Sequence, residues 1–184
     1  CSAKNLVVGN ADISTWCGYS QSNNRINKLI IIGKTGKNSD TLTINGTGGC
    51  DFFGAMDGGY IFVNNITINT QASITSNNLS MIRMENVNVT SSATNKDISS
   101  QRSGHMQLNN VTTSSHGIGA ESGSMIYLEN TSSKKMNIKR NGTISGDNVT
   151  ISDLTMDTAG VAEFNKLTID CSNGSSACIT AYAG

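Results

Sequence analysis

Proline is absent from this 184-residue chain, and no long stripe of apolar residues recurs at the period of an amphipathic helix. Because every residue keeps its backbone N–H, an unbroken ladder of strand hydrogen bonds is possible. No run approaches the ~20 apolar residues that a membrane-spanning helix requires. We therefore expect strands as the main regular structure and no transmembrane segment.

Net charge is lacking as well, because 13 Lys and Arg residues balance 13 Asp and Glu residues. A nucleic-acid-binding protein would concentrate basic residues to neutralise phosphates. The only basic cluster comprises Lys134, Lys135, Lys139 and Arg140, and we interpret it as an ordinary solvated face. We expect no nucleic-acid partner.

Uncharged polar residues dominate what is present: 23 Asn, 24 Ser and 19 Thr make up more than a third of the chain. Disordered chains can be this polar, but they lack periodic β-branched residues and usually carry net charge. Here Ile, Val and Thr recur regularly, and Asn and Gly can supply corner conformations. The composition predicts a folded, polar, β-rich protein of one domain.

A short phrase recurs along the chain: a polar residue, Asn, and then apolar, polar and apolar residues. It occupies residues 64–68, 85–89, 109–113, 129–133 and 147–151, with looser forms at 40–44 and 165–169. The five anchoring Asn residues lie 21, 24, 20 and 18 residues apart. A turn residue followed by a short β-branched strand at a near-constant interval predicts a parallel β-solenoid.

Alternation within the phrase separates an inner from an outer set of side chains. We expect the inner set to stack into one aliphatic column: Ile66, Ile68, Val87, Val89, Val149, Ile151, Leu167 and Ile169. Thr67, Asn88, Thr112, Thr150 and Thr168 would form an outer polar ladder. Further strands are predicted at 81–84, 106–108, 125–128 and 136–138, with their Met residues filling gaps in the core.

The interval of about 20 residues predicts eight or nine coils in a single all-β domain over residues 1–184. We expect an N-terminal entry or capping region at 1–40, regular coils at 41–170, and a C-terminal disulfide loop with a last strand at 171–184. Aromatic residues near the N-terminal third, including Trp16, Phe52, Phe53, Tyr60 and Phe62, are expected to plug the end of the core. Sugar stacking by exposed rings is the alternative.

The Asn anchors have two interpretations. Asn65, Asn86, Asn110 and Asn148 are predicted to form a ladder of amide hydrogen bonds along the solenoid axis. Alternatively, each Asn caps its own turn. Several anchors also begin Asn-x-Ser/Thr sequences, which a eukaryotic secreted protein could glycosylate, but the strand phrase produces this pattern by itself.

The chain has five cysteines but no Cys-x-x-Cys motif, so we do not expect them to bind zinc. Disulfides are the better explanation, and they indicate an oxidising compartment. Cys171 and Cys178 bracket a loop that can close easily, and Cys17 could meet Cys50 one or two coils later. Cys1 would then carry a lipid or bond to another subunit; alternatively, it pairs with Cys17 and leaves Cys50 free. Because the first residue is Cys1 rather than Met, we expect a processed, exported chain.

No catalytic constellation stands out. His105 and His116 are interpreted as surface residues, and Asp153 and Asp157 lack the accompanying ligands of a calcium site. The acidic motifs of pectin-degrading β-helix enzymes are missing in recognisable form. We expect no catalytic residue, no metal site and no cofactor; His105, Asp153 and Asp157 would be the first mutants if an enzyme were sought.

In its repeated Asn-Val-Thr-Ile texture, the segment 40–169 resembles bacterial parallel β-helix surface proteins, namely autotransporter passengers and filamentous-haemagglutinin-like adhesins. The resemblance implies a right-handed solenoid, export, and a role in adhesion, aggregation or surface display. It assigns no individual functional residue.

The two ends of a solenoid carry unpaired backbone groups that can add strands from another chain. Leu6, Val7 and Val8 begin the chain with an apolar strand, and Ile179 and Tyr182 lie in a last strand. We therefore expect subunits to stack head to tail into an extracellular fibre. The alternative is a surface-anchored adhesin that binds a host glycan or protein, and a carbohydrate-active enzyme is a third hypothesis. A periodic ice-binding surface is a further possibility.

Overall fold

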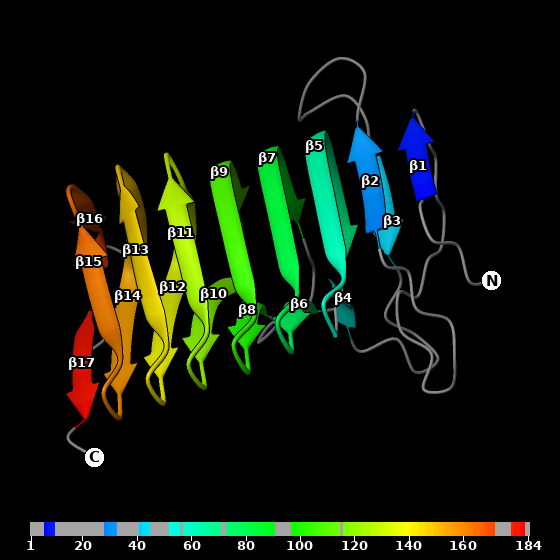
Figure 1. Cartoon of the computed structure of the whole chain (residues 1–184). Coiled ribbons are helices and arrows are strands. Elements are labelled where there is room, and N and C mark those ends of the chain that lie inside the picture. Colours follow the sequence, from blue (N-terminus) through cyan, green and yellow to red (C-terminus); the bar gives the residue numbers. More distant parts are fainter. Residues whose placement is uncertain are drawn as a thin grey trace.

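The computed structural model describes residues 6–9, 28–32, 41–44, 52–55, 57–70, 73–90, 97–114, 116–171 and 178–182. Its strands coil into one parallel β-solenoid whose turns stack along a single axis (Figure 1). All strand pairs are parallel, as expected for a chain that returns to the same wall once per turn. The predicted all-β parallel β-solenoid is confirmed.

Three walls run along the axis. The first wall contains β1 (Leu6–Gly9), β2 (Lys28–Ile32), the first halves of β5 (Tyr60–Thr70), β7 (Met81–Thr90) and β9 (His105–Thr113), then β11 (Met125–Glu129), β13 (Thr143–Asp147) and β15 (Val161–Phe164). The second wall contains β3 (Thr41–Ile44), the second halves of β5, β7 and β9, the first residues of β12 (Ser132–Lys139) and β14 (Val149–Asp157), and β16 (Leu167–Ile169). The third wall contains β4 (Phe52–Ala55), β6 (Ser73–Asn77), β8 (Asp97–Gln101), β10 (Gly117–Glu121), the remainders of β12 and β14, and β17 (Ile179–Tyr182).

About five turns follow one another between Tyr60 and Asp157, each with strands on all three walls. Strands β1 to β4 and β15 to β17 extend the ladders at the two ends. The sequence estimate of eight or nine coils assigned one coil to every 20 residues, including the segments outside the described ranges.

The interior is a stack of aliphatic columns. On the first wall Ile82, Met106 and Ile126 occupy successive levels in register, and each is at most 1% exposed. On the second wall Ile66 pairs in register with Val87, and Val87 with Val111. The predicted stacking of successive phrases is confirmed, as is the outer row of Thr67, Asn88, Thr112, Thr150 and Thr168. Ser132 lies in the same row, although it was not predicted there.

The methionines divide between the two faces of the first and third walls. Met84, Met106 and Met136 fill the core as predicted. Met81 and Met125 do not, because they occupy the outward column that also holds Tyr60 and His105; Met125 is 50% exposed. Expecting every Met to fill the core was wrong because side chains alternate along a strand, whatever their chemistry.

A second corner recurs with the same spacing as the Asn anchors. Before each first-wall strand from β5 to β15, two residues with positive φ precede a Gly or Ser: Gly59, Ser80, Gly104, Ser124, Gly142 and Gly160. The hydrogen bonds Gly104 N–H to Gln101 O (2.9 Å) and Gly142 N–H to Lys139 O (2.9 Å) close these turns, which have the two left-handed central residues of type I′. We call this position the Gly/Ser corner.

Within the five turns from Tyr60 to Asp157, coil length varies only at the remaining corner, between the second and third walls. We count from the inward-facing residue on the second wall before this corner to the first inward-facing residue on the third wall. The chain advances six residues from Ile68 to Ile74, nine from Val89 to Ile98, and three from Ser133 to Met136. Within these turns the other two corners keep a fixed length, so insertions are absorbed at this variable corner without disturbing the register of the walls. Between β2 and β3 the corner that joins the first and second walls is six residues longer, since Ile32 and Thr41 are in register with Asn64 and Thr67.

Candidate functional site

The Asn anchors occupy the corner between the first and second walls. Asn65, Asn86, Asn110, Asn130 and Asn148 all adopt left-handed backbone conformations, with φ between 48° and 56°. Asn tolerates this region better than other residues with a Cβ. The side chains also bond along the axis: Asn110 Nδ2 donates to Asn86 Oδ1 (2.8 Å), and Asn148 Nδ2 donates to Asn130 Oδ1 (2.8 Å).

The ladder therefore exists, and capping and laddering are combined in the same residues. Its N-terminal contact differs in detail from the expectation, because Asn86 Nδ2 donates to Asn64 Oδ1 at 3.3 Å. Asn130 belongs to the ladder although it was not among the predicted members. Its sequence signal was weaker, since the residue after it is Thr131 rather than an aliphatic one.

Replacing Asn110 with alanine should lower the free energy of unfolding by about 1–3 kcal/mol. The change removes a half-buried amide partner of Asn86. It also places alanine, which adopts left-handed backbone conformations less readily than Asn, at φ 53°. Asn110→Gly is the matched control, because glycine loses the same side-chain contacts as alanine but accepts the backbone conformation. Urea unfolding of the wild type and the two variants measures the contributions of the amide contact and of the backbone conformation. Three superimposable transitions would contradict the ladder.

The C-terminal end of the solenoid leaves core side chains partly uncovered. Ala162, Phe164, Leu167 and Ile169 hold the core positions of the last level, directly in register with Ile144, Gly146, Val149 and Ile151. The earlier four are buried, whereas the last four are only half-buried although they pack against the core. Among the described residues, no further level of the solenoid lies above them.

The backbone at this end is also available. Val161 N–H donates to Gly142 O (3.0 Å) and Asn165 N–H to Gly146 O (3.1 Å), so these groups point back to the preceding turn. The intervening Ala162 and Phe164 alternate with them and point their backbone groups toward the open edge. Within the described part of the chain, β15 pairs only with β13, and β16 and β17 pair only with β14.

The predicted end-stacking residues fall in two groups. Ile179 extends the core column of Leu154 and is 62% exposed at the open end, whereas Tyr182 extends the outward column of Asp157. At the other end, Leu6, Val7 and Val8 do form a strand, β1, in register with residues 29–31 of β2. Their side chains lie outside what the structure describes.

The chain is electrically neutral overall, but its charges are unevenly distributed. Residues 1–50 contain five Lys and Arg against two Asp and Glu, and residues 147–184 contain one against five. The N-terminal part is therefore basic and the C-terminal part acidic.

A disulfide joins Cys171 and Cys178, whose Cα atoms are 5.7 Å apart. The predicted pair is confirmed, and it closes the loop that leads into β17. A disulfide fits an oxidising compartment. Cys1, Cys17 and Cys50 lie outside the described residues, so their predicted roles stay predictions.

The outer face of the first wall carries aromatic and apolar side chains. Tyr60 and Phe62 lie in its outward columns, in register with Met81 and Arg83, and are half-buried. Expecting these two rings to plug the end of the core was wrong, since both occupy positions of β5 that alternate with the buried ones. Trp16, Phe52 and Phe53 fall on residues or side chains that the structure does not describe.

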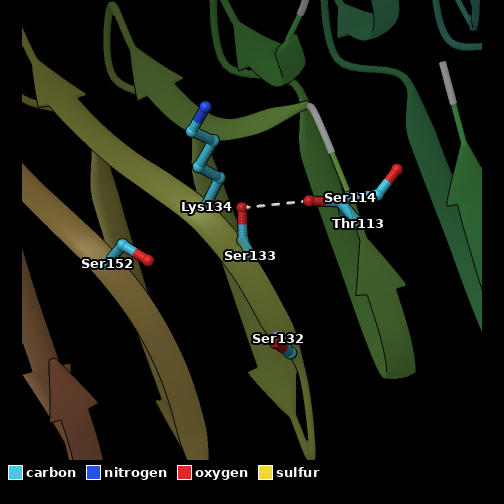
Figure 2. A pocket seen from close by; sticks show the side chains of 6 residues that line it. All are labelled: Thr113, Ser114, Ser132, Ser133, Lys134 and Ser152. Carbon is cyan, nitrogen blue, oxygen red and sulfur yellow. Dashed lines mark hydrogen bonds between the residues drawn. The ribbon is translucent and has the colours of Figure 1, made fainter. Parts of the chain in front are cut away.

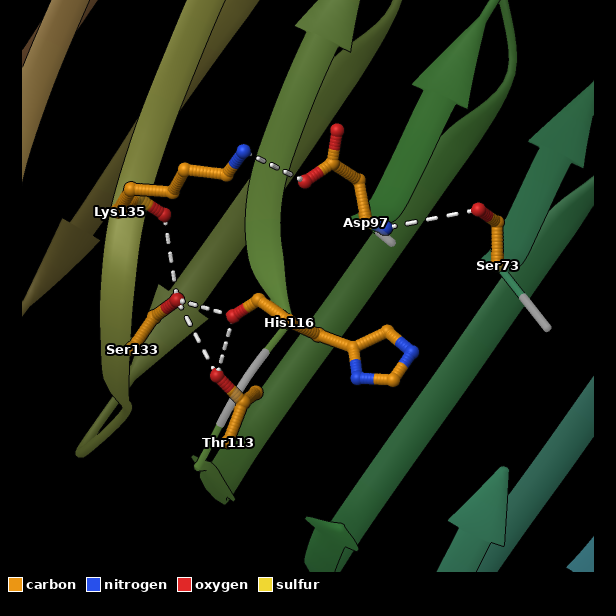
Figure 3. Close-up of polar contacts among 6 residues, drawn as sticks. All are labelled: Ser73, Asp97, Thr113, His116, Ser133 and Lys135. Carbon is orange, nitrogen blue, oxygen red and sulfur yellow. Dashed lines mark hydrogen bonds and ion pairs between the residues drawn. The ribbon is translucent and has the colours of Figure 1, made fainter. Parts of the chain in front are cut away.

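The two histidines differ in environment. His105 is exposed on the first wall, as predicted, but His116 is fully buried at the variable corner. Its carbonyl oxygen accepts from Thr113 Oγ1 (2.6 Å) and lies 3.1 Å from Ser133 Oγ (Figure 3). The surface assignment of His116 was wrong because the corner folds this residue back under the third wall.

A polar hollow of about 480 Å³ opens beside this corner, lined by Thr113, Ser114, Ser132, Ser133, Lys134 and Ser152 (Figure 2). Nearby, Lys135 Nζ lies 3.6 Å from Asp97 Oδ1, two levels away (Figure 3). This contact passes over Gly117, where a Cβ would lie 2.6 Å from the Lys135 chain. The basic cluster is thus partly paired, while Lys134, Lys139 and Arg140 are exposed.

The residues that would be mutated first in a search for an enzyme do not lie together. Asp153 and Asp157 lie on the third wall in β14, whereas His105 lies on the first wall, so they share no site. No group of three or more His, Cys, Asp or Glu residues in the described part of the chain could hold a metal ion. Among the same residues, no helix has the length and hydropathy needed to cross a membrane.

No protein-family model, curated protein or solved structure matches the chain.

Proposed function

We propose that this protein is a non-enzymatic extracellular structural protein whose subunits stack end to end into a surface fibre. In this proposal the solenoid is right-handed, as in the surface proteins that the sequence resembles, and its eight or nine coils repeat along the filament. Its partner is a second copy of the same chain, and it reaches the cell surface through an oxidising compartment.

The observation that carries the proposal is the incompletely covered core at the C-terminal end. Leu167, Ile169 and Ile179 stand at core positions with no described level above them. A second solenoid placed on this face would cover these side chains and pair the open strand edges, just as each turn does for the turn before it. Both gains come from contacts that the fold already uses internally.

The distribution of charge supports a head-to-tail arrangement over a symmetric one. Tail-to-tail contact would bring two acidic ends together, whereas head-to-tail contact joins an acidic end to a basic one. A heterologous contact of this kind does not close on itself and generates an open filament. Parallel strands also require the same chain direction on both sides of the junction, which head-to-tail stacking preserves.

Electron microscopy of the purified chain should show uniform unbranched fibres, and Leu167→Asp should abolish them. The substitution places a carboxylate at a half-buried core position of the open end, where a stacked subunit would have to desolvate it. Thr168→Asp is the matched control: it adds the same charge one residue later, on the exposed outer side of β16, and should still assemble.

Circular dichroism on both variants separates loss of assembly from loss of folding. A wild-type chain that remains a monodisperse short rod at every concentration would overturn the proposal, and so would Leu167→Asp fibres indistinguishable from wild type. Assembly should also slow as salt rises from 0.1 M to 1 M, because the Debye length falls from about 10 Å to about 3 Å.

A further inference from the structure

A narrow groove crosses three levels of the first wall and is separate from the end faces. Its floor and rims come from β7, β9 and β11, and its volume is about 120 Å³. Two outward columns line it: Arg83, Gln107 and Tyr127 form one, and Glu85, Asn109 and Glu129 form the other. Within each column, planar polar groups therefore follow one another at the strand spacing of about 4.8 Å.

The aromatic member of this set is available to a ligand. Tyr127 is 46% exposed, although it lies in the middle of a regular sheet. Arg83 is held in place from two sides, since it forms an ion pair with Glu85 and its guanidinium lies 5.7 Å from the centre of the Phe62 ring. The groove thus combines an exposed aromatic ring with a guanidinium group that is already held in position.

We propose that this groove binds a sugar unit of an uncharged glycan. A sugar ring has C–H groups on one face that pack on an aromatic ring, and hydroxyls at its edge that both donate and accept hydrogen bonds. Tyr127 supplies the ring. Gln107 and Asn109 supply amides that donate and accept, and Glu85 and Glu129 accept from adjacent hydroxyls.

The charges of the groove determine which glycans fit. Arg83 is neutralised by Glu85, and Glu129 is followed in its column by Asp147 on the next level. The net local charge is therefore negative. Sialylated or sulfated sugars would be repelled, while uncharged hexoses and N-acetylhexosamines would not. The inference is independent of fibre assembly, because the groove is complete within one chain.

The test is binding of the full chain to immobilised uncharged oligosaccharides and to their sialylated and sulfated counterparts. The Leu167→Asp chain is used beside wild type, so that binding by one groove is measured without the multivalency of a fibre. We expect binding to uncharged sugars by both chains. Tyr127→Ala and Gln107→Ala should each weaken it by about tenfold.

Met125→Ala is the control, since Met125 lies two residues earlier on the same strand, is similarly exposed (50% against 46% for Tyr127), and does not line the groove. It should bind as the parent chain does. Absence of binding to every uncharged sugar, exclusive binding to charged ones, or equal binding by Tyr127→Ala and its parent would each overturn the assignment. None of these results depends on whether fibres form.

Discussion

Replacing Ile144 with aspartate is expected to leave the chain unfolded at room temperature. Ile144 is fully buried on the first wall, in register between Ile126 and Ala162, so a carboxylate there would lack both water and a cation. Burying an unpaired charge costs many kcal/mol, and domains of this size are stable by only about 5–15 kcal/mol. Circular dichroism and urea unfolding would show the loss.

Thr143→Asp is the matched control for Ile144→Asp. Thr143 precedes Ile144 on β13 and occupies the outward column beside Met125 and Val161. The same charge at that position should change the free energy of unfolding by about 1 kcal/mol or less. Equal tolerance of both substitutions would contradict the alternation on which the stacked core depends.

Replacing Gly142 with valine should destabilise the protein by about 3 kcal/mol or more. A Cβ at this Gly/Ser corner would collide with the Ala120 carbonyl and lie 2.9 Å from the Glu121 nitrogen, both of which belong to the turn below. The turn cannot move freely, because Gly142 N–H is bonded to Lys139 O and Asn141 N–H to Thr158 O. Overpacking against fixed backbone is costly.

Gly142→Ser is the informative comparison for Gly142→Val. At the equivalent corner Ser124 is accommodated because its hydroxyl donates to Ser100 O (2.6 Å) and accepts from Glu121 N–H (3.0 Å). Ser80 makes the same kind of contact with Ala55 O (2.7 Å). Serine should therefore cost clearly less than valine in thermal unfolding; equal melting temperatures for the two variants would show that the corner is not selected by close backbone contact.

The walls follow from sequence because the side-chain period of a strand is two. The alternation in Ile66, Thr67 and Ile68 predicts one buried column and one polar row, and both are present. The Asn anchors were recognised for the same reason, since each precedes such a strand by one residue. Here local pattern and tertiary stacking agree, which is typical of repeat proteins.

The Gly/Ser corner was readable from sequence but was missed. Gly104, Ser124 and Gly142 each stand six residues before Asn110, Asn130 and Asn148, so the small residue shares the interval of the anchor. The signal is faint because Gly and Ser are abundant throughout the chain. Only the structure shows why Gly and Ser share this position: the neighbouring backbone lies close to it, and a Ser hydroxyl can hydrogen-bond to that backbone.

Other features depend on contacts that no local pattern encodes. His116 is buried because the variable corner folds it inward, and the length of that corner follows no period. The groove on the first wall joins residues from three levels, so Arg83 and Tyr127 become neighbours of Gln107 only once the register is known. The sequence pattern could identify inward-facing and outward-facing positions, but not which outward side chains from different levels would be neighbours.

Fibre diffraction from aligned, assembled protein tests the central claim most directly. If strands of successive subunits continue the ladders of Leu167, Ile169 and Ile179, the reflection at about 4.8 Å lies parallel to the fibre axis. Fibres whose 4.8 Å reflection lies perpendicular to that axis, or protein that never forms fibres to align, would contradict the account.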